Sequence, residues 1–467
     1  MILQQYYLGC LSHASYLLAD PKSGSAVVVD PQRDVDQYLA DADKLGLRIT
    51  DVVLTHFHAD FVAGHLELRE RAGARIHLGA RAQAEYAFVP AQEGAVLERG
   101  ALRLQFLETP GHTPESICVL VFDLEQDAER PHAVLTGDTL FIGDVGRPDL
   151  MASIGVTGEE LAGLLYDSLH EKLLHLPDGT LVYPAHGAGS MCGKSLSKER
   201  VSTIGEQRRY NYALQPMTKA DFIRLVTMEQ PEAPAYFPYD AMLNRSERPS
   251  LETTLEKVLQ PLPLEEVLRL HLAGAQVLDV RDPGDYAGAH FLGSTNVGLQ
   301  GQFASWCGTL LRRDRPIVLI AETGKETEAA LRLGRIGFDH VAGYLEGGMQ
   351  ALEQRPDLLR HTERITAQAL AERLNGDDPP HVLDVRTDAE REAKRIVGSV
   401  HVPLHQLAGR VAEVPRSGHV VIHCGGGYRS MIAASLLEQQ GFTNCSDLVG
   451  GYAAWDLLDE RSMRATS

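Results

Sequence analysis

A short segment that follows a predicted strand, THFHADF at positions 55–61, combines two histidines with an aspartate. Three further residues of these types, His112, Asp138 and His186, each stand just beyond the end of another predicted strand. Imidazole and carboxylate groups are common metal ligands, and loops that rigid strands hold in place give such ligands a fixed geometry. The sequence therefore predicts a metal centre in the first half of the chain.

The first half of the chain alternates short apolar runs with segments of helical pattern. Most of the runs are rich in valine, leucine and isoleucine and end at glycine, proline, aspartate or histidine, as strands do. The predicted strands are 25–30, 51–55, 75–78, 102–107, 117–122, 133–136 and 181–183. Several prolines between positions 231 and 263 indicate a connector to the second half.

The residue types in these turns favour a particular chemistry. One ion held by two imidazoles and one carboxylate on one face would keep three positions of an octahedron open. That arrangement is the facial triad of non-haem Fe(II) oxygenases, in which substrate and O₂ can bind together. The residues alone leave open which of the histidines bind the ion directly.

The second half of the chain contains an internal repeat. LDVR at 278–281 recurs at 383–386, and GS at 293–294 recurs at 398–399. In both copies an apolar strand then leads into a loop and a helix. Each copy therefore predicts a small α/β domain with a parallel sheet.

In the second copy this loop reads HCGGGYRS at 423–430. The three glycines let the backbone curl so that its N–H groups point inward, and the next helix presents its N-terminus to the same centre. Such a site favours an anion, so Cys424 is expected as a thiolate nucleophile, and Arg429 can bind an oxyanion with two hydrogen bonds. The residues predicted to surround a substrate at Cys424 are Gly425, Gly426, Gly427, Tyr428 and Arg429.

The equivalent loop of the first copy, AETGKET at 321–327, has no cysteine. Its acidic residues would repel a sulfur anion, and Cys307 lies outside it. We expect this copy to be non-catalytic and to serve as a spacer or docking surface. Cys445 has no comparable setting and is expected to be structural.

Four motifs together resemble the persulfide dioxygenase branch of the metallo-β-lactamase superfamily. They are THFHADF, TPGHTPES at 109–116, LTGDTLFIGDVGRPDL at 135–150 and YPAHGAG at 183–189. The resemblance implies an αββα sandwich that oxidises a low-molecular-weight thiol persulfide, R–S–SH, with O₂ to sulfite and free thiol. It assigns one Fe(II) per chain to His56, His112 and Asp138.

The resemblance gives the neighbouring polar residues a supporting role. His58, Asp60 and His186 would orient ligands or substrate, with direct ligation by His58 as the alternative. Arg147 would contact a substrate anion, unless it forms an ion pair with Asp144 or Asp149. Cys192 follows the His186 loop and could approach the metal as a thiol, or remain a buried inert cysteine.

Phe61 departs from the pattern of the superfamily. The full turn, His-x-His-x-Asp-His, supplies ligands for two metals and usually accompanies hydrolysis. Phenylalanine cannot ligate, so its presence in the last position removes a ligand of the second metal. The variant turn therefore favours a mononuclear centre.

The loop with Cys424, the DVR strand and GGYAAW at 450–455 resemble a rhodanese domain over residues 365–460. Four residues separate Cys424 from Arg429, which is the short loop of sulfurtransferases, whereas related phosphatases carry one more. The first copy resembles an inactive rhodanese. The expected fold class is α/β throughout, with a metallo-β-lactamase domain at 1–245, a linker at 246–262, an inactive rhodanese at 263–360 and a catalytic rhodanese at 361–467.

The expected function joins the two sites. Sulfite from the iron centre would attack a persulfide on Cys424 and give thiosulfate, or the reverse step would feed the dioxygenase. Two alternatives remain open: a thioester hydrolase of the glyoxalase II type, with two metals, and a non-enzymatic persulfide carrier or sensor. The thiol that carries the persulfide is not apparent from any motif.

Composition limits the partners. The 467 residues carry a formal net charge of −19 with no cluster of lysine and arginine, which argues against nucleic acid and anionic membranes as partners. The 6 cysteines include no Cys-x-x-Cys pair, which fits a reducing compartment. The first residues lack a basic segment of the signal-peptide type. We therefore expect a cytoplasmic enzyme without a membrane span and, by resemblance, a homo-oligomer.

Overall fold

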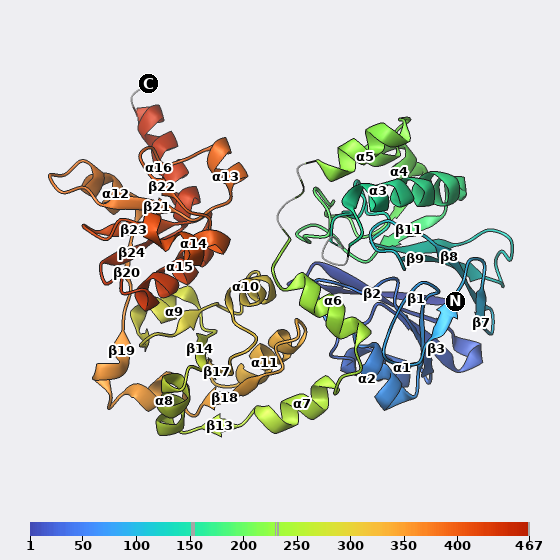
Figure 1. The fold of residues 1–467 in the computed structure, drawn as a ribbon, viewed down its shortest axis with the longest axis horizontal. Helices are drawn as coiled ribbons and strands as arrows, with labels where there is room; N and C mark the ends of the chain where they lie inside the picture. Colours follow the sequence, from blue (N-terminus) through green and yellow to red (C-terminus); the bar gives the residue numbers. More distant parts are fainter. Residues whose placement is uncertain (151–154, 229, 231–232, 466–467) are drawn as a thin grey trace. The chain divides into compact units, whose positions relative to one another are not determined.

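The computed structural model describes residues 1–150, 155–228, 230 and 233–465. The chain forms two compact units. The first unit comprises residues 1–254 and 333–339, and the second comprises residues 255–332 and 340–467. The predicted fold class is confirmed, since an αββα sandwich is followed by two small α/β domains with parallel sheets (Figure 1).

Two six-stranded sheets form the centre of the first unit. The first sheet has the order β1-β2-β3-β4-β5-β6 and consists of β1 (Ile2–Leu8), β2 (His13–Asp20), β3 (Ser25–Val29), β4 (Arg48–Val53), β5 (Arg75–Gly79) and β6 (Val89–Ala91). The second has the order β12-β11-β10-β9-β8-β7 and consists of β7 (Val96–Arg99), β8 (Leu102–Glu108), β9 (Ile117–Asp123), β10 (Ala133–Gly137), β11 (Leu181–Pro184) and β12 (Ser202–Thr203). The predicted strands are confirmed as β3, β4, β5, β8, β9, β10 and β11, with small shifts at their ends.

Helices cover the outer faces of both sheets (Figure 1). The first sheet is covered by α1 (Asp36–Lys44) and α2 (His65–Ala72), and the second by α3 (Gly158–Asp167), α4 (Ile204–Tyr210) and α5 (Lys219–Thr227). A strand that is covered on both faces needs a continuous apolar run. Strand β9 is an example, because all of its residues are buried. Its alternate residues point in opposite directions, toward the facing sheet on one side and toward the helices on the other.

The first sheet begins with a hairpin that the sequence pattern does not reveal. β1 and β2 pair in antiparallel fashion, with Leu8 opposite His13. β1 reads ILQQYYL and all of its residues are only half-buried, so it shows neither a clean alternation nor an apolar run. The hairpin matters for the site because β2 begins at His13.

The topology brings several strand ends to one edge. β8 and β10 run in the same direction because both pair in antiparallel fashion with β9, and β11 is parallel to β10. The turns that follow them carry His112, Asp138 and His186. In the other sheet, β4 leads directly into the turn with His56.

The second unit contains two five-stranded sheets with only parallel neighbours. The first has the order β13-β18-β17-β14-β16 and consists of β13 (Pro261–Leu262), β14 (Gln276–Asp279), β16 (Thr295–Asn296), β17 (Ile317–Ile320) and β18 (Val341–Leu345). The second has the order β20-β24-β23-β21-β22 and consists of β20 (Glu363–Ile365), β21 (His381–Asp384), β22 (Val400–His401), β23 (Val420–His423) and β24 (Cys445–Leu448). A separate pair joins β15 (His290–Phe291) to β19 (Leu359–Arg360). The predicted repeat is therefore confirmed strand by strand.

The recurring DVR motif has a structural reason. Asp279 and Asp384 are buried at the ends of β14 and β21, and each pairs with the arginine two residues further on, at 2.6 Å for Arg281 and 2.7 Å for Arg386. The arginine compensates a carboxylate that would otherwise be buried without a partner. The helices of this unit are α8 (Leu264–Leu272), α9 (Pro283–Gly288), α10 (Phe303–Leu310), α11 (Glu326–Gly334), α12 (Ala367–Leu374), α13 (Asp388–Ala393), α14 (Leu407–Arg410), α15 (Tyr428–Gln439) and α16 (Gly451–Ala465).

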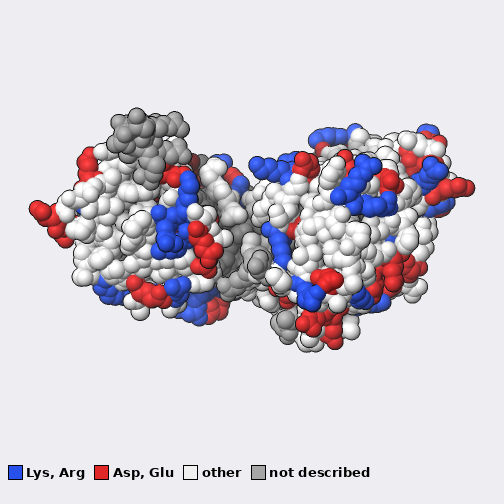
Figure 2. All heavy atoms as spheres, turned by 90° about the horizontal axis from the view of Figure 1, so that it is seen from above, with Lys and Arg blue, Asp and Glu red and all other residues white. Residues whose placement is uncertain are grey.

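The connector contains more regular structure than its prolines suggest. Within the predicted linker, 246–262, Leu251–Val258 forms helix α7, and Phe237–Arg245 just before it forms α6. Among the described residues, no helix combines the length and apolar character needed to cross a bilayer. On the face shown in Figure 2, lysine and arginine side chains lie interspersed with aspartate and glutamate.

Candidate functional site

His56, His112 and Asp138 lie together at the edge where β4, β8 and β10 end. Their ligand atoms all lie within 4.8 Å of one another. Oδ2 of Asp138 is 3.8 Å from Nε2 of His56 and 3.5 Å from Nε2 of His112. Metal bonds to imidazole and carboxylate are about 2 Å long, so one ion could reach all three atoms. The structure thus brings together the residues assigned as iron ligands, and their ligand role stays a prediction.

The second polar atom of each of these three side chains lies within hydrogen-bond distance of a neighbouring residue. Nδ1 of His56 is 3.0 Å from the Thr55 hydroxyl, Nδ1 of His112 donates to the Arg147 carbonyl at 2.9 Å, and Oδ1 of Asp138 is 2.7 Å from Nδ1 of His186. By contrast, Nε2 of His56 and Oδ2 of Asp138 are buried and have no hydrogen-bond partner among the described residues. Buried polar atoms rarely lack partners, so these convergent atoms fit a metal ion.

The protonation states also suit a metal. Burial, and then the nearby His58, lowers the pKa of His56 well below its usual value, and burial likewise lowers the pKa of His112. Both imidazoles are therefore neutral. Burial alone would raise the pKa of Asp138, but His186 and His56 hold it well below the usual value. Neutral imidazole and ionised carboxylate are the forms that bind metals.

His58, Asp60 and His186 form a second buried group. Nε2 of His58 lies 3.1 Å from Oδ1 of Asp30, and Nε2 of His186 lies 2.9 Å from Oδ2 of Asp60. Burial would lower the pKa of His186, but the charges of Asp138 and Asp60 raise it well above the usual value, so it bridges the two carboxylates as a cation. Both ring nitrogens of His58 lack a hydrogen-bond partner among the described residues, so the orienting role and direct ligation by His58 both stay open.

Phe61 fills the place beside this second group. Its ring is fully buried and its centroid lies 4.4 Å from that of His58 and 4.0 Å from that of His13. His13 was not predicted from the sequence; it is buried, and its Nε2 has no hydrogen-bond partner in the described chain. An isolated β-bridge pairs His13 with His186 and explains the position of His13. No local sequence pattern could have predicted this pairing.

Arg147 does not present a free guanidinium to a substrate. It is buried and forms a two-point ion pair with Asp149, in which Nε and Nη2 each donate at 2.7 Å. The structure thus shows the ion pair with Asp149 that was the alternative to a substrate contact. A substrate anion could reach the guanidinium only if that pair opened, so the substrate contact stays a prediction. The carbonyl of Arg147, rather than its side chain, serves the site by orienting His112.

Cys192 lies close to Asp138 and His186, and both its role at the metal site and the alternative of an inert buried cysteine stay open. Its sulfur lies within 4.8 Å of ligand atoms of Asp138 and His186. The residue is also buried, and burial together with the charges of Asp60 and Asp138 raises the pKa of its thiol well above the usual value. Cys192 is therefore a neutral thiol beside the centre.

Asn244, which was not predicted from the sequence, stabilises the conformation of the metal-binding turn. Its side-chain amide donates to the carbonyls of His58 and Phe61 at 2.8 Å each, and its side-chain carbonyl accepts from the N–H of Ala63 at 2.8 Å. Asn244 is buried on α6 and is 186 residues away from His58 in the sequence. Only the folded chain connects it with the turn.

Replacing Asn244 by alanine should destabilise the turn and weaken metal binding. The change leaves three buried backbone groups without partners, which should lower the free energy of unfolding by about 2–4 kcal/mol. Because these bonds orient the ligand turn, metal affinity should fall by about 10–100-fold. Thermal unfolding and competition with a chelator would measure the two effects. Asn211→Ala, which removes bonds to the 141–144 loop, is the control; an equal loss of metal affinity there would contradict the specific role.

The cysteine loop lies at the carboxyl end of β23. Cys424 is buried, and the N–H of Gly427 donates to its sulfur at 3.1 Å. Gly427 has a φ of 104°, a conformation that favours glycine, and it directs this N–H toward the sulfur as α15 begins. The hydroxyl of Ser430 is 3.5 Å from the sulfur. One N–H of the predicted curl, that of Gly427, therefore points at the sulfur, and the anion-binding and catalytic roles of the loop remain predictions.

Arg429 is held by an acidic partner that was not predicted. Its two terminal nitrogens donate to Glu390 of α13 at 2.6 and 2.7 Å. Burial would raise the pKa of Glu390, but the bonds from Arg429 and Thr387 lower it to about 2. An oxyanion at Cys424 must share Arg429 with this carboxylate. The only sequence signal is an acidic residue at the same spacing after both DVR motifs, Asp285 and Glu390.

Tyr428 was expected to bind substrate, but its phenol is directed elsewhere. The hydroxyl donates to the carbonyl of Gly298 in the first repeat at 2.8 Å. Gly425 and Gly426 carry no side chain that could tether the loop. The side chain of Tyr428 is therefore a tether of the loop rather than part of a substrate cradle.

The first repeat has the expected loop without cysteine between β17 and α11. Cys307 lies on α10 instead, where burial raises the pKa of its thiol well above the usual value. Burial also raises the pKa of Cys445 to about 11. Neither cysteine has the setting of Cys424.

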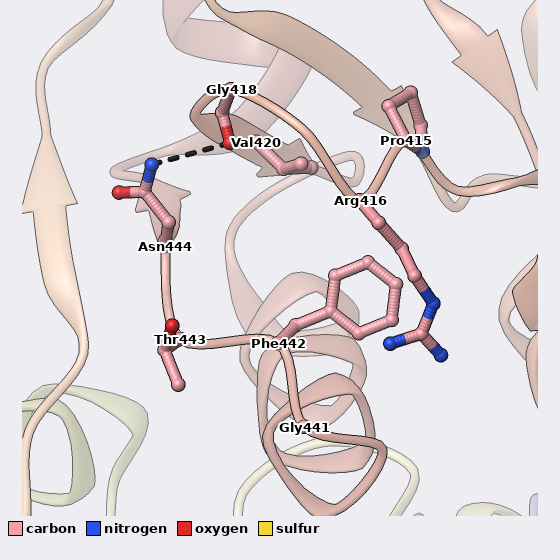
Figure 3. A pocket seen from close by; sticks show the side chains of 8 residues that line it. All are labelled: Pro415, Arg416, Gly418, Val420, Gly441, Phe442, Thr443 and Asn444. Carbon is pink, nitrogen blue, oxygen red and sulfur yellow. Dashed lines mark hydrogen bonds between the residues drawn. The ribbon is translucent and has the colours of Figure 1, made fainter.

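A shallow pocket in the second repeat lies at the wrong end of the sheet to serve Cys424 (Figure 3). It is found where β23 and β24 begin, whereas Cys424 follows the end of β23. Its lining consists of Pro415, Arg416, Gly418, Val420, Gly441, Phe442, Thr443 and Asn444. The pocket is therefore not part of the cysteine site.

The fold agrees with known families. Residues 8–186 match the metallo-beta-lactamase superfamily, and residues 264–355 and 366–457 match the rhodanese-like domain. The chain belongs to the metallo-β-lactamase superfamily, as a member whose metal domain is followed by two rhodanese-like domains.

Particular relatives are known for the metal domain. The mitochondrial persulfide dioxygenase ETHE1 of Bos taurus is 31% identical over 214 residues, which are 45% of this chain and 75% of that protein. A hydroxyacylglutathione hydrolase of Polaromonas sp. is 34% identical over 190 residues, 40% of this chain and 66% of that protein. A metallo-beta-lactamase crystal structure from Staphylococcus aureus has a TM-score of 0.66 and 31% identity, and covers 74% of this chain and 98% of that one. The superfamily thus includes close relatives with two different activities.

Proposed function

We propose that the first unit is a mononuclear Fe(II) persulfide dioxygenase and that Cys424 performs a coupled rhodanese step. The observation that carries the proposal is the convergence of ligand atoms from His56, His112 and Asp138, of which Nε2 of His56 and Oδ2 of Asp138 have no hydrogen-bond partner among the described residues. Two imidazoles and one carboxylate form the donor set of a facial triad, and the aromatic ring of Phe61 stands where a second ion would need a ligand.

The proposed oxidation balances as R–S–SH + O₂ + H₂O → R–SH + SO₃²⁻ + 2 H⁺, with four electrons passing from sulfur to O₂. Bound Fe(II) would supply O₂ activation and hold the persulfide sulfur. Thr55 and the Arg147 carbonyl orient the imidazoles, while His186 keeps a proton between Asp138 and Asp60. Burial of the whole group limits access of water.

The proposed sulfur transfer uses Cys424 as the nucleophile. Its thiolate attacks the terminal sulfur of R–S–SH, which forms Cys424–S–S⁻ and releases R–SH. Sulfite then attacks the outer sulfur, so that a new S–S bond gives thiosulfate while the bond to Cys424 breaks and the thiolate returns. Gly427 N–H and Arg429 would hold the anions. One chain with both sites raises the local concentration of sulfite, and the same groups could run the step in reverse.

The first alternative is thioester hydrolysis, which the name of the Polaromonas relative describes. A dinuclear hydrolase needs ligands for two ions and a bridging hydroxide. Phe61 disfavours that reading for this chain. The second alternative, a persulfide carrier or sensor without catalysis, would leave the fit of the metal group unexplained.

Phe61→His should restore the missing ligand and change the metal content. The new imidazole would stand beside His58 and His13, near Asp60 and His186, and should raise metal binding from about one to about two ions per chain. Metal analysis after equilibration with Zn²⁺ would test this, with Phe61→Leu as the control for loss of the ring. Two ions per chain already in the wild-type protein would contradict the mononuclear assignment.

The substrate is expected to be a small thiol persulfide, and O₂ uptake against a panel would identify its carrier. Glutathione, coenzyme A, bacillithiol and cysteine persulfides share the reacting sulfur. We expect uptake with at least one of them, and sulfite or thiosulfate in matching amounts. No uptake with any of them would contradict the proposed function and favour the carrier or sensor.

A further inference from the structure

The glycine-rich part of the cysteine loop has no side chains of its own, so its shape depends on the residues that follow. Three consecutive residues tether it to three different elements. Arg429 binds Glu390 of α13, Ser430 donates to Asp447 of β24 at 2.6 Å, and Tyr428 donates to Gly298 at 2.8 Å. Two tethers lie within the second repeat, whereas the third reaches the first repeat.

The Tyr428 side chain is packed as well as hydrogen-bonded. A Cβ atom added to Gly301 would lie only 3.5 Å from Cζ of Tyr428, and one on Gly298 would lie 3.6 Å from its Cε2. The phenol therefore rests directly on the glycine-containing 298–301 loop of the first repeat. Burial raises the pKa of Tyr428, and the nearby Cys307 of α10 acts in the same direction. The first repeat thus surrounds this side chain.

The rest of α15 continues this contact. The hydroxyl of Ser435 accepts from the N–H of Asn296 at 3.1 Å, and the side-chain amide of Gln439 donates to Thr295 at 2.8 Å and to the Gly293 carbonyl at 3.0 Å. The middle of α15 is buried on nearly all sides because β23 and β24 lie against one face and β16 against another. The helix that begins at the cysteine loop is therefore supported by both repeats.

We propose that the first repeat, whose equivalent loop at 321–327 contains no cysteine, is a support that fixes the cysteine loop of the second repeat, and that Tyr428 is the positioning residue through which it acts. Tyr428 occupies the first position of α15, directly after the glycine whose N–H donates to Cys424. Holding this residue holds the first turn of the helix against the sulfur. The proposal rests on the proposed role of Cys424 as sulfur acceptor.

Tyr428→Phe in the full-length protein tests the tether while keeping the ring. Losing one hydrogen bond should let the loop open about fivefold more often. Because Cys424 is only 1% exposed, its alkylation by iodoacetamide, followed on the Cys424 peptide by mass spectrometry, should become about fivefold faster. In the thiosulfate–cyanide reaction kcat should fall by a similar factor, with KM for thiosulfate within twofold of the wild-type value.

Gln439→Ala is the matched control, because it removes two bonds between the same helix and the same repeat at the far end of α15. We expect it to leave alkylation of Cys424 and kcat within twofold of wild type, even if thermal stability falls equally in both variants. Alkylation of Tyr428→Phe within twofold of wild type, or equal acceleration in both variants, would overturn the proposal. A wild-type protein without sulfur transfer would instead contradict the proposed function, and alkylation would still decide the supporting role of Tyr428.

Discussion

Replacing Cys424 by serine is expected to leave O₂ uptake with persulfide unchanged and to shift the product from thiosulfate to sulfite. Serine keeps the size of the side chain but cannot accept and release a sulfane sulfur. Sulfur transfer should therefore fall by about 10³-fold or more, the effect of removing a catalytic nucleophile. Oxygen uptake and the two sulfur products would be measured in the same reaction, after correction for non-enzymatic thiosulfate formation.

Cys445→Ser is a suitable control in the same repeat. Cys445 begins β24 and is half-buried, and it lies outside the glycine-rich loop. The thiosulfate yield should remain at the wild-type level in this variant. An unchanged thiosulfate yield in Cys424→Ser would contradict the coupling of the two sites.

His112→Ala is expected to remove bound iron and O₂ uptake together while rhodanese activity persists. The change deletes one of three convergent ligand groups and should reduce metal affinity by at least about 100-fold, since even orienting partners contribute 10–100-fold. The second repeat has its own sheet and core, so sulfur transfer from thiosulfate to cyanide should be retained. Metal analysis and both activity assays on one preparation would test this.

His132→Ala provides the comparison for this prediction. His132 is exposed and precedes β10, outside all three groups of described residues that could hold a metal. Iron content and O₂ uptake should match wild type in this control. Iron retained at the wild-type level in His112→Ala would show that the ligand assignment is wrong.

Most of the fold could be predicted because its signals are local. The apolar runs of β3, β4 and β9 reflect burial on both faces, and the repeated LDVR reflects a buried aspartate that needs a nearby arginine. The β1–β2 hairpin could not be predicted, since the half-buried β1 mixes polar and apolar residues. Helix α7 was not predicted, because the prolines around it indicated a connector.

The site was predictable where its residues follow strand ends, as His56, His112 and Asp138 do. The contacts that decide the state of each side chain join distant positions and leave no local pattern. Glu390 holds Arg429 from 39 residues away, and Asn244 reaches His58 over 186. The partner of Arg147 could not be decided from the sequence, although Asp149 was one of the candidates. Only the fold shows that the two side chains form an ion pair.

The metal content of the wild-type protein distinguishes a mononuclear iron centre from a dinuclear zinc centre. Metal content would be determined on the sample whose O₂ uptake with a thiol persulfide and whose thioester hydrolysis are both measured. We predict about one iron per chain, with one O₂ consumed for each sulfite or thiosulfate formed and no hydrolysis above background. Two zinc ions per chain, with thioester hydrolysis and no O₂ uptake, would contradict the assignment and favour the hydrolase.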